Sequence, residues 1–157
     1  MKIGIIGNGF VGKATFILKC TDIDIIVYDI NPDLCIPTNM SLENLVETSD
    51  VIFISVPTPM SDTGKCHLDI LKNVINQIKL YCDINQKLIV SRCTVPPGTS
   101  DLNNCYFMPE FLTEKNFKQD FINNAQWVFG LKNNTKFQLQ NLFFKKTMTK
   151  MINLAYN

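Results

Sequence analysis

Short runs of apolar, strand-forming residues alternate along this chain with stretches whose apolar residues are spaced as in a helix. The runs are bounded by Gly, Pro, Asn or Asp, which is typical of buried strands, and they span residues 2–6, 24–28, 51–54, 87–90, 105–108 and 126–129. Helices are predicted over residues 11–20, 42–47, 68–81 and 137–146, with a further helix starting at 149. This alternation favours an α/β fold, with a doubly wound, mainly parallel sheet and helices on both faces.

Composition limits the number of domains and the classes of partner. A chain of 157 residues that is 46% hydrophobic has the size and the core of one domain. Its net charge is +1 and Arg92 is the only arginine, so we expect no nucleic-acid partner. No run approaches the ~20 apolar residues of a membrane helix, so we expect no membrane partner.

The cysteines indicate a compartment rather than a site. There are six, without a C-x-x-C pair, and His67 is the only histidine, so a zinc site is not predicted. No signal peptide is visible at the N-terminus. We therefore expect free thiols and a cytoplasmic protein. Cys93 and Cys105 fall in or beside predicted strands, which indicates small buried thiols rather than nucleophiles.

A glycine pattern, G-N-G-F-V-G, joins the first predicted strand to the first predicted helix. Gly7 would permit a tight turn, Gly9 would let a pyrophosphate approach the backbone, and Gly12 would let the helix pack closely on the strand. The free N–H groups at the start of the helix suit phosphate. The pattern predicts the dinucleotide-binding turn of a Rossmann-like fold; the alternative is a plain strand-to-helix turn.

Asp29 closes the second predicted strand, 17 residues after Gly12. A carboxylate there can accept hydrogen bonds from both ribose hydroxyls of NAD, and it would repel the 2′-phosphate of NADP. No arginine follows it directly, since the next residues are Ile30, Asn31 and Pro32. NAD is therefore the predicted cofactor, and the alternative for Asp29 is a solvated strand end.

Rigid segments follow the later predicted strands, at residues 55–59 (SVPTP), 91–99 (SRCTVPPGT) and 108–112 (MPEFL). The carboxyl ends of parallel strands share one edge of the sheet, where ligands of such folds bind. The polar side chains expected near this edge are Thr58, Thr94, Thr99, Glu110 and Glu114.

Five blocks of sequence carry a family resemblance. They are GIIGNGFVG, SVPTPMSDTGKCHLD, TVPPGT, PEFLTE and QDF followed by WVFG. In order and spacing they resemble the N-terminal NAD-binding domain of the UDP-glucose/GDP-mannose dehydrogenase family, over essentially the whole chain. The resemblance implies an oxidoreductase that uses two NAD to oxidise the C6 hydroxyl of a nucleotide sugar, as from UDP-glucose to UDP-glucuronate, through a thioester on a cysteine.

The resemblance also implies a role for each matching residue. The adenosine and pyrophosphate half of NAD would be held by Gly7, Gly9, Phe10, Val11, Gly12 and Asp29, and the cofactor cleft would be lined by Val56, Pro57 and Thr58. Thr94 would lie beside the nicotinamide and help to order a catalytic water. Glu110 would be the acid–base group of thioester hydrolysis, and Glu114 would lie near nicotinamide and substrate. Phe111 and Leu112 would present backbone to the sugar. The alternative for Glu110 and Glu114 is a surface loop with two solvated acids.

The chain departs from the family pattern in four ways. The family's catalytic cysteine, central helix and sugar-nucleotide domain would lie beyond Asn157, so we expect a shortened form with residues 1–157 as a single NAD-binding domain. Asn153 stands where a catalytic lysine is expected, although Asn157 matches a family asparagine; an amide lacks the charge that stabilises an oxyanion. Residues 100–104 are too few for the family's helix, which predicts an exposed groove. Lys115 and Asn116 replace the usual glycine.

Three functions therefore stay open. The chain is the cofactor half of an enzyme completed by other sequence, a shortened NAD(H)-binding module or pseudoenzyme with a binding or regulatory role, or a structural piece that has lost the cofactor. The presence of Asp29, Thr94, Glu110 and Glu114 disfavours the last. Expected partners are NAD(H), a nucleotide sugar and a complementing chain, with the protein a monomer or a dimer unlike that of the family.

Overall fold

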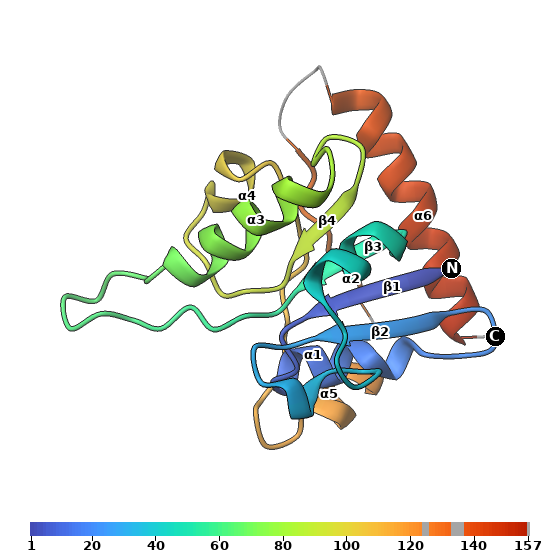
Figure 1. The fold of residues 1–157 in the computed structure, drawn as a ribbon, viewed down its shortest axis with the longest axis horizontal. Coiled ribbons are helices and arrows are strands. Elements are labelled where there is room, and N and C mark those ends of the chain that lie inside the picture. The colour runs from blue at the N-terminus through green and yellow to red at the C-terminus, as the bar shows by residue number, and fades with distance from the viewer. Residues whose placement is uncertain (124–125, 133–136, 157) are drawn as a thin grey trace.

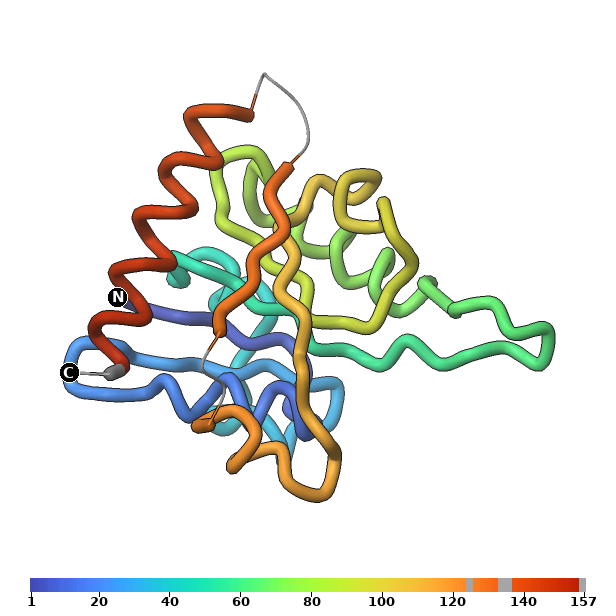
Figure 2. Tube along the Cα trace, turned by 180° about the vertical axis from the view of Figure 1, so that it is seen from behind, coloured from blue at the N-terminus to red at the C-terminus, as the bar shows by residue number. Residues whose placement is uncertain are grey.

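A five-stranded parallel sheet forms the centre of the molecule (Figures 1 and 2). The structure is a computed structural model that describes residues 1–123, 126–132 and 137–156. The strand order is β2-β1-β3-β4-β5. The strands are β1 (Lys2–Ile6), β2 (Asp24–Tyr28), β3 (Val51–Ile54), β4 (Leu88–Ser91) and β5 (Tyr106–Phe107).

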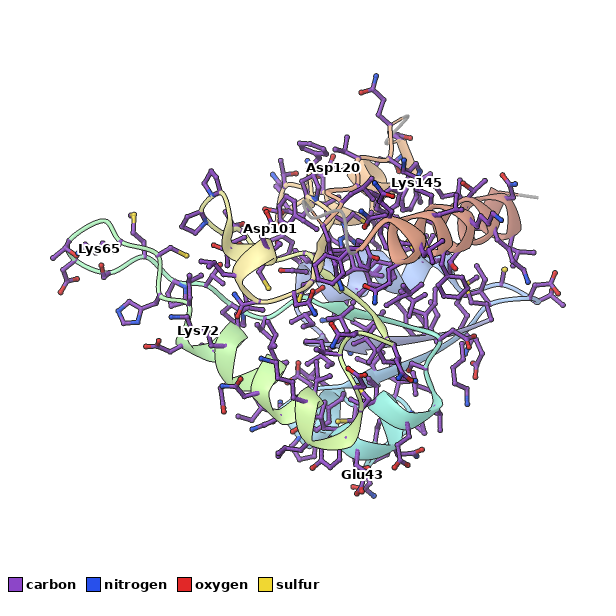
Figure 3. All side chains as sticks on the ribbon, turned by 90° about the horizontal axis from the view of Figure 1, so that it is seen from above. Glu43, Lys65, Lys72, Asp101, Asp120 and Lys145 are labelled. Carbon is purple, nitrogen blue, oxygen red and sulfur yellow. The ribbon has the colours of Figure 1, made fainter. Side chains whose placement is uncertain are left out.

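Helices cover both faces of this sheet. They are α1 (Phe10–Thr15), α2 (Leu42–Thr48), α3 (Asp69–Tyr81), α4 (Thr99–Leu102), α5 (Phe117–Asn123) and α6 (Gln138–Tyr156), with short 3₁₀ helices η1 (Phe16–Leu18) and η2 (Pro32–Leu34). One core cluster joins the sheet to α2 and α3, and the other joins it to α1, α5 and α6. Figure 3 shows Glu43 and Lys72 on one side of the sheet, and Asp120 and Lys145 on the other. The predicted doubly wound Rossmann-like fold is confirmed.

The central strands are buried on both faces, which explains their continuous apolar sequences. In β1, Ile3 and Ile5 are fully buried in the cluster with α1, α5 and α6, whereas Ile6 is buried in the cluster with α2 and α3. Side chains of a strand alternate between the two faces of its sheet. Sequence alternation cannot be seen in such a strand, so its length and its bounding residues have to identify it.

The predicted sixth strand, over residues 126–129, is wrong. The structure assigns no strand there, and only Gly130 forms an isolated antiparallel bridge, with Phe107 of β5. The apolar character of this segment serves aromatic packing instead: Trp127 contacts Phe121 edge-on at 5.4 Å, and Phe129 contacts Phe144 in the same way at 5.6 Å. Aromatic packing and strand pairing favour the same residue types, so the sequence could not separate them.

Helix α6 unites the helix predicted over 137–146 with the one predicted to start at 149. Phe144, Met148 and Met151 are buried against the sheet, and the Phe144 ring stacks on Tyr106 of β5 with centroids 3.8 Å apart. Residues 100–104 were expected to be too few for the helix that the family has there. In the structure this part of the chain holds only the four-residue helix α4. Within the described residues, no helix is both long and apolar enough to cross a membrane.

The two ends of the sheet differ in what they expose. The N-terminus and the last turns of α6 lie at the amino end of β1, and the loop between β3 and α3 projects from the opposite end (Figure 1). This loop is a hairpin closed by an antiparallel bridge between Met60 and Cys66. The carboxyl ends of the strands, where the sequence predicts a site, therefore lie at the end with the projecting loop.

Candidate functional site

A cleft of about 1060 Å³ lies at the carboxyl ends of the first four strands. Its walls are the turn after β1, the end of β2, the segment after β3, one side of α3, and Arg92, Thr94 and Glu110. A volume of this size is at the upper end of the range for small-molecule and cofactor sites. The sheet topology thus places the predicted loops around one cavity.

The three glycines of the turn have different surroundings. Gly7 has φ +95°, and a Cβ there would lie 2.5 Å from the carbonyl oxygen of Ser55. A Cβ on Gly12 would lie 2.0 Å from the carbonyl oxygen of Gly7. A Cβ on Gly9, by contrast, would meet no atom within 4 Å. Gly7 and Gly12 are therefore required by the fold itself, whereas Gly9 leaves bare backbone at the cleft, as the approach of a pyrophosphate requires.

Asp29 is fixed in the cleft by two backbone N–H groups. Asn8 N–H donates to Oδ2 at 2.7 Å and Asn31 N–H donates to Oδ1 at 2.9 Å. The buried Asn8 side chain donates to the carbonyl of Leu34 at 2.7 Å, which holds the glycine turn against the segment after β2. Each carboxylate oxygen keeps a further lone pair, so Asp29 can still accept two hydroxyl groups. The residues present thus fit the ribose and pyrophosphate of a dinucleotide.

Thr94 and Glu110, which also line the cleft, form a hydrogen-bonded pair. Thr94 Oγ1 donates to Glu110 Oε1 at 2.7 Å. Thr58 Oγ1 donates to the carbonyl of Thr94 at 2.7 Å, which ties the projecting loop to the end of β4. A carboxylate with a neighbouring hydroxyl can hold a water molecule or accept a proton from one. The pair has the composition of an acid–base site.

Arg92 is a buried cation beside this pair. Its side chain is 1% exposed, donates from Nη1 to Thr15 Oγ1 and lies 5.4 Å from the Phe121 ring centroid. Within the described part of the chain, Nε has no hydrogen-bond partner. Burial lowers the pKa of Arg92 to about 10, an effect opposed by the charge of Glu110. The guanidinium therefore stays positive near neutral pH, at a cleft expected to receive phosphate groups.

Two buried thiols of this region, Cys93 and Cys105, are poor nucleophiles. Burial raises the pKa of Cys93 to about 11 and that of Cys105 to about 12. All six cysteines, each in the described part of the chain, are free. The prediction that Cys93 and Cys105 are buried thiols is confirmed.

A family model covers most of this region. The model of the UDP-glucose/GDP-mannose dehydrogenase family, NAD binding domain, matches residues 33–148. The chain belongs to this family. NAD is therefore its cofactor, as the sequence predicts. The matched range includes Thr94 and Glu110 but starts after the glycine turn and Asp29, so the geometry described above is what supports those two features.

Two similar curated proteins are named as dehydrogenases of nucleotide sugars. The UDP-N-acetyl-D-mannosamine dehydrogenase of Methanocaldococcus jannaschii is 32% identical over 127 residues, which are 64% of this chain and 30% of the relative. A UDP-glucose 6-dehydrogenase of Bacillus subtilis is 27% identical, over 82% of this chain and 37% of the relative. The chain thus spans about a third of the length of these two dehydrogenases.

Solved structures of the family share the fold. The GDP-mannose dehydrogenase of Pseudomonas aeruginosa superposes with a TM-score of 0.70 at 22% identity, over 92% of this chain and 44% of that one. The UDP-glucose dehydrogenase of Pyrobaculum islandicum gives a TM-score of 0.74 at 20% identity, over 92% of this chain and 42% of that one. At these identities the likeness shows the fold alone.

In this dehydrogenase domain most of the predicted site residues line the cleft. Those that do are Gly7, Gly9, Phe10, Val11, Asp29, Val56, Pro57, Thr58, Thr94 and Glu110. Gly12 is buried beneath the turn. The loop after β5 stays outside the cleft lining beyond Glu110: Phe111 and Glu114 are exposed, and Leu112 is half-buried against the core.

That loop is nevertheless held in a defined shape. Phe111 has a left-handed backbone, with φ 41°, which a bulky side chain rarely adopts. Thr113 donates from its backbone N–H and its hydroxyl to Asp120 of α5, at 2.7 and 2.6 Å. These hydrogen bonds lower the pKa of Asp120 below its ordinary value. Backbone strain that the surroundings maintain is common where a loop meets a ligand.

Asn153 of α6 stands where the family resemblance implies a lysine, but it does not lie at the cleft. Asn153 is exposed and borders a shallow depression with Lys145, Lys146 and Lys150, and it is not part of the cleft lining. Asn157, which matches a family asparagine, lies outside the described residues. The structure therefore does not bring Asn153 together with Thr94 and Glu110.

Sequence reasoning missed several lining residues. They are Tyr28, Ile30, Leu34, Ser55, Ile70, Asn73, Val74, Gln77 and Arg92. One sequence feature could have indicated the position of Arg92. It lies two residues after Val90, so the alternation of side chains along β4 places both on the face of the sheet covered by α1, α5 and α6. The residues of α3 had a weaker one: Ile70, Asn73, Val74 and Gln77 are spaced as one side of a helix.

Proposed function

We propose that this chain is the NAD-binding part of a UDP-glucose 6-dehydrogenase-like enzyme. The observation that supports it is the Thr94–Glu110 hydrogen bond, 2.7 Å long, on the same cleft as the glycine turn and Asp29. The names of the relatives, which include UDP-glucose 6-dehydrogenases, support the substrate class. When bound, NAD supplies a hydride acceptor.

The residues of the chain divide the remaining work. Gly9 and the first N–H groups of α1 hold the pyrophosphate, with Phe10 and Val11 beside it, and Asp29 accepts the ribose hydroxyls. The residues Val56, Pro57 and Thr58 exclude water from the cofactor. Gly12 acts indirectly, by letting α1 start directly beneath the turn.

Glu110 and Thr94 handle protons and water. The Thr94 hydroxyl donates to Glu110 Oε1, which leaves Oε2 free to accept a proton from a water molecule that attacks an acyl intermediate. Phe111, Leu112 and Glu114 follow Glu110 directly, so we assign them to the substrate side of the reaction. Their position outside the cleft lining is compatible with contacts to a sugar rather than to the adenosine half of NAD.

We also propose that the two-step oxidation requires residues beyond this chain. The thioester expected from the family resemblance needs a reactive cysteine, and Cys93 and Cys105 are buried with raised pKa values. Cys66 Sγ points at the carbonyl of Thr94, 3.6 Å away, and is not part of the cleft lining. The alternative is an NAD(H)-binding module without turnover, which the position of Asn153 favours.

Nuclear magnetic resonance with two ligands tests the cofactor assignment. ADP-ribose lacks the nicotinamide ring of NAD but keeps the adenosine and pyrophosphate. Both ligands should shift the amide signals of Gly9 and Val11, whereas only NAD should shift the methyl signal of Thr94. A Thr94 signal that ignores NAD while Val11 responds would refute the proposed place of the pair beside the nicotinamide.

A spectroscopic assay tests the reaction. The chain with NAD and UDP-glucose should produce no NADH by itself, and it should produce NADH when joined to the remaining part of a family dehydrogenase. In the joined protein, Glu110→Gln should abolish NADH formation after the first turnover. A joined protein that binds NAD yet oxidises no nucleotide sugar would favour the binding-module alternative.

A further inference from the structure

Helix α6 runs along one flank of the molecule, and only one of its sides packs on the sheet (Figures 1 and 2). Phe144, Met148 and Met151 belong to the buried side. The opposite side is an exposed stripe, called here the outer stripe, and it consists of Leu139, Leu142, Phe143, Lys146, Lys150 and Asn153. None of these six residues lines the cofactor cleft, so a role of the outer stripe is separate from cofactor binding.

The first turns of the outer stripe are apolar. Leu139 is 82% exposed, Leu142 is 51% exposed and Phe143 is 60% exposed. Their spacing of three and four residues makes them neighbours on the helix surface, so they form one patch. Single exposed apolar residues need no explanation, whereas a contiguous patch bordered by charged residues is typical of an interaction site.

The last turns of the outer stripe are basic. Lys146 and Lys150 lie one turn apart, Lys145 lies beside them, and α6 contains no acidic residue. Within the described part of the chain, none of these three lysines forms an ion pair. Together with Thr149 and Asn153 they border a hollow of about 450 Å³. This half of the stripe therefore offers unpaired ammonium groups around a recess that a carboxylate side chain can enter.

The outer stripe is not complementary to a second copy of itself. Two parallel copies would place lysine against lysine, and two antiparallel copies would place the lysines of one copy against Leu139 and Phe143 of the other. A lipid bilayer is flat on this scale, whereas the basic half of the stripe is hollowed. An acidic protein segment with apolar side chains at one end matches both halves.

We propose that the outer stripe of α6 docks an acidic helical segment of another protein. Apolar side chains of that segment pack on Leu139, Leu142 and Phe143, and its carboxylates pair with Lys146 and Lys150. The contact gives the NAD-binding domain a protein partner that leaves the cleft open, and it does not require the proposed reaction.

Fluorescence anisotropy with labelled synthetic peptides tests this proposal. The probe is a helical peptide of about 20 residues, which matches the length of α6, with leucines at one end of a stripe and glutamates at the other. It is made in both chain directions. A control peptide has the same composition with leucines and glutamates intermixed. In at least one direction the probe should bind at least about tenfold more tightly than the control peptide.

Charge reversal locates the contact. Lys146→Glu combined with Lys150→Glu should weaken probe binding by about tenfold, and a probe with lysines in place of its glutamates should restore it. Phe143→Ala should weaken binding severalfold. Lys72→Glu is the matched control, because Lys72 is an exposed lysine of α3 on the other side of the sheet (Figure 3), and it should bind as wild type does. If charge reversal unfolds the protein in a urea titration, Lys146→Gln with Lys150→Gln gives the same comparison.

Three outcomes would overturn the proposal. The first is equal binding of probe and control peptides, or an equal loss of binding in Lys72→Glu. The second is a dimer of the wild-type chain in sedimentation that Phe143→Ala abolishes, which would assign the stripe to a second copy. The third is binding to phosphatidylserine vesicles that requires Lys146 and Lys150, without binding of the probe, which would assign the stripe to a membrane surface.

Discussion

Two glycines of the turn after β1 differ in what they contribute: Gly12 is needed for folding, and Gly9 is assigned to ligand binding. Gly12 has a backbone oxygen where its Cβ would be, and Gly9 has only open space. The three glycine roles follow from a local pattern, so the sequence alone could predict them. The presence of Arg92 and Asn73 in the cleft lining could not be predicted in this way, because it depends on which distant segments meet at the cleft.

This contrast gives a paired prediction for two alanine variants. Gly9→Ala should change the free energy of unfolding by less than about 1 kcal/mol, because Gly9 has φ −70° and space for a methyl group. It should weaken NAD binding by about tenfold or more by blocking the pyrophosphate. Gly12→Ala should instead destabilise the fold by about 3 kcal/mol, because the displaced atom is backbone. Denaturant unfolding and calorimetry measure both effects; normal NAD affinity in Gly9→Ala would contradict the assignment.

At the scale of elements, the sequence located the strands well and the helix ends less well. Strands β1, β2 and β3 have the predicted bounds, whereas α1 ends at Thr15 rather than at residue 20 and continues as 3₁₀ turns. Helix α5 was not predicted, and residues 126–129 were wrongly assigned as a strand. Both errors fall where aromatic side chains pack over the edge of the sheet. Apolar residues in such a segment do not repeat every two residues, as in a strand, or every 3.6 residues, as in a helix.

The capping of α2 is one prediction at this scale. Ser41 Oγ accepts a hydrogen bond from the backbone N–H of Asn44 at 3.1 Å. Ser41→Ala should lower the free energy of unfolding by about 1 kcal/mol, and Ser41→Asp, which restores the acceptor, should recover most of this loss. Equal stability of the two variants would show that the cap does not contribute.

The docking of α6 provides a second matched pair. Phe144 is fully buried and stacks on Tyr106, while its neighbour Phe143 is 60% exposed. Phe144→Ala should destabilise the protein by about 3–5 kcal/mol, and Phe143→Ala should change stability by less than about 0.5 kcal/mol. Urea unfolding of the two variants distinguishes them. A similar cost at both positions would contradict the orientation of this helix.

For the whole molecule, stability should fall in alkaline solution. Burial raises the pKa of Cys93, Cys105 and Tyr106 above their ordinary values, so the unfolded chain loses these protons first as the pH rises. The stabilisation is complete below the unfolded value of 9.0 for the thiols and is lost as the pH approaches about 11 to 12. The lowered pKa of Arg92 acts in the opposite direction, because its burial cost is relieved as the pH rises through about 10.

The measurement is unfolding free energy between pH 8 and pH 10, below the range where Arg92 contributes most. Cys105→Ala should reduce the loss of stability over this interval by about 1 kcal/mol relative to wild type. Identical pH dependence in the two proteins would show that the Cys105 thiol does not resist ionisation in the fold.

The proposed cofactor site has NAD lying along the carboxyl ends of the strands, with its ribose on Asp29. Calorimetric titration of the wild-type chain and of Asp29→Asn with NAD and NADP tests this most directly. Wild type should bind NAD and should bind NADP at least about tenfold more weakly, and Asp29→Asn should reduce this preference severalfold by removing the charge that repels the 2′-phosphate. A wild-type chain that binds both dinucleotides equally, or a preference unchanged in Asp29→Asn, would contradict the placement of the adenosine ribose on Asp29.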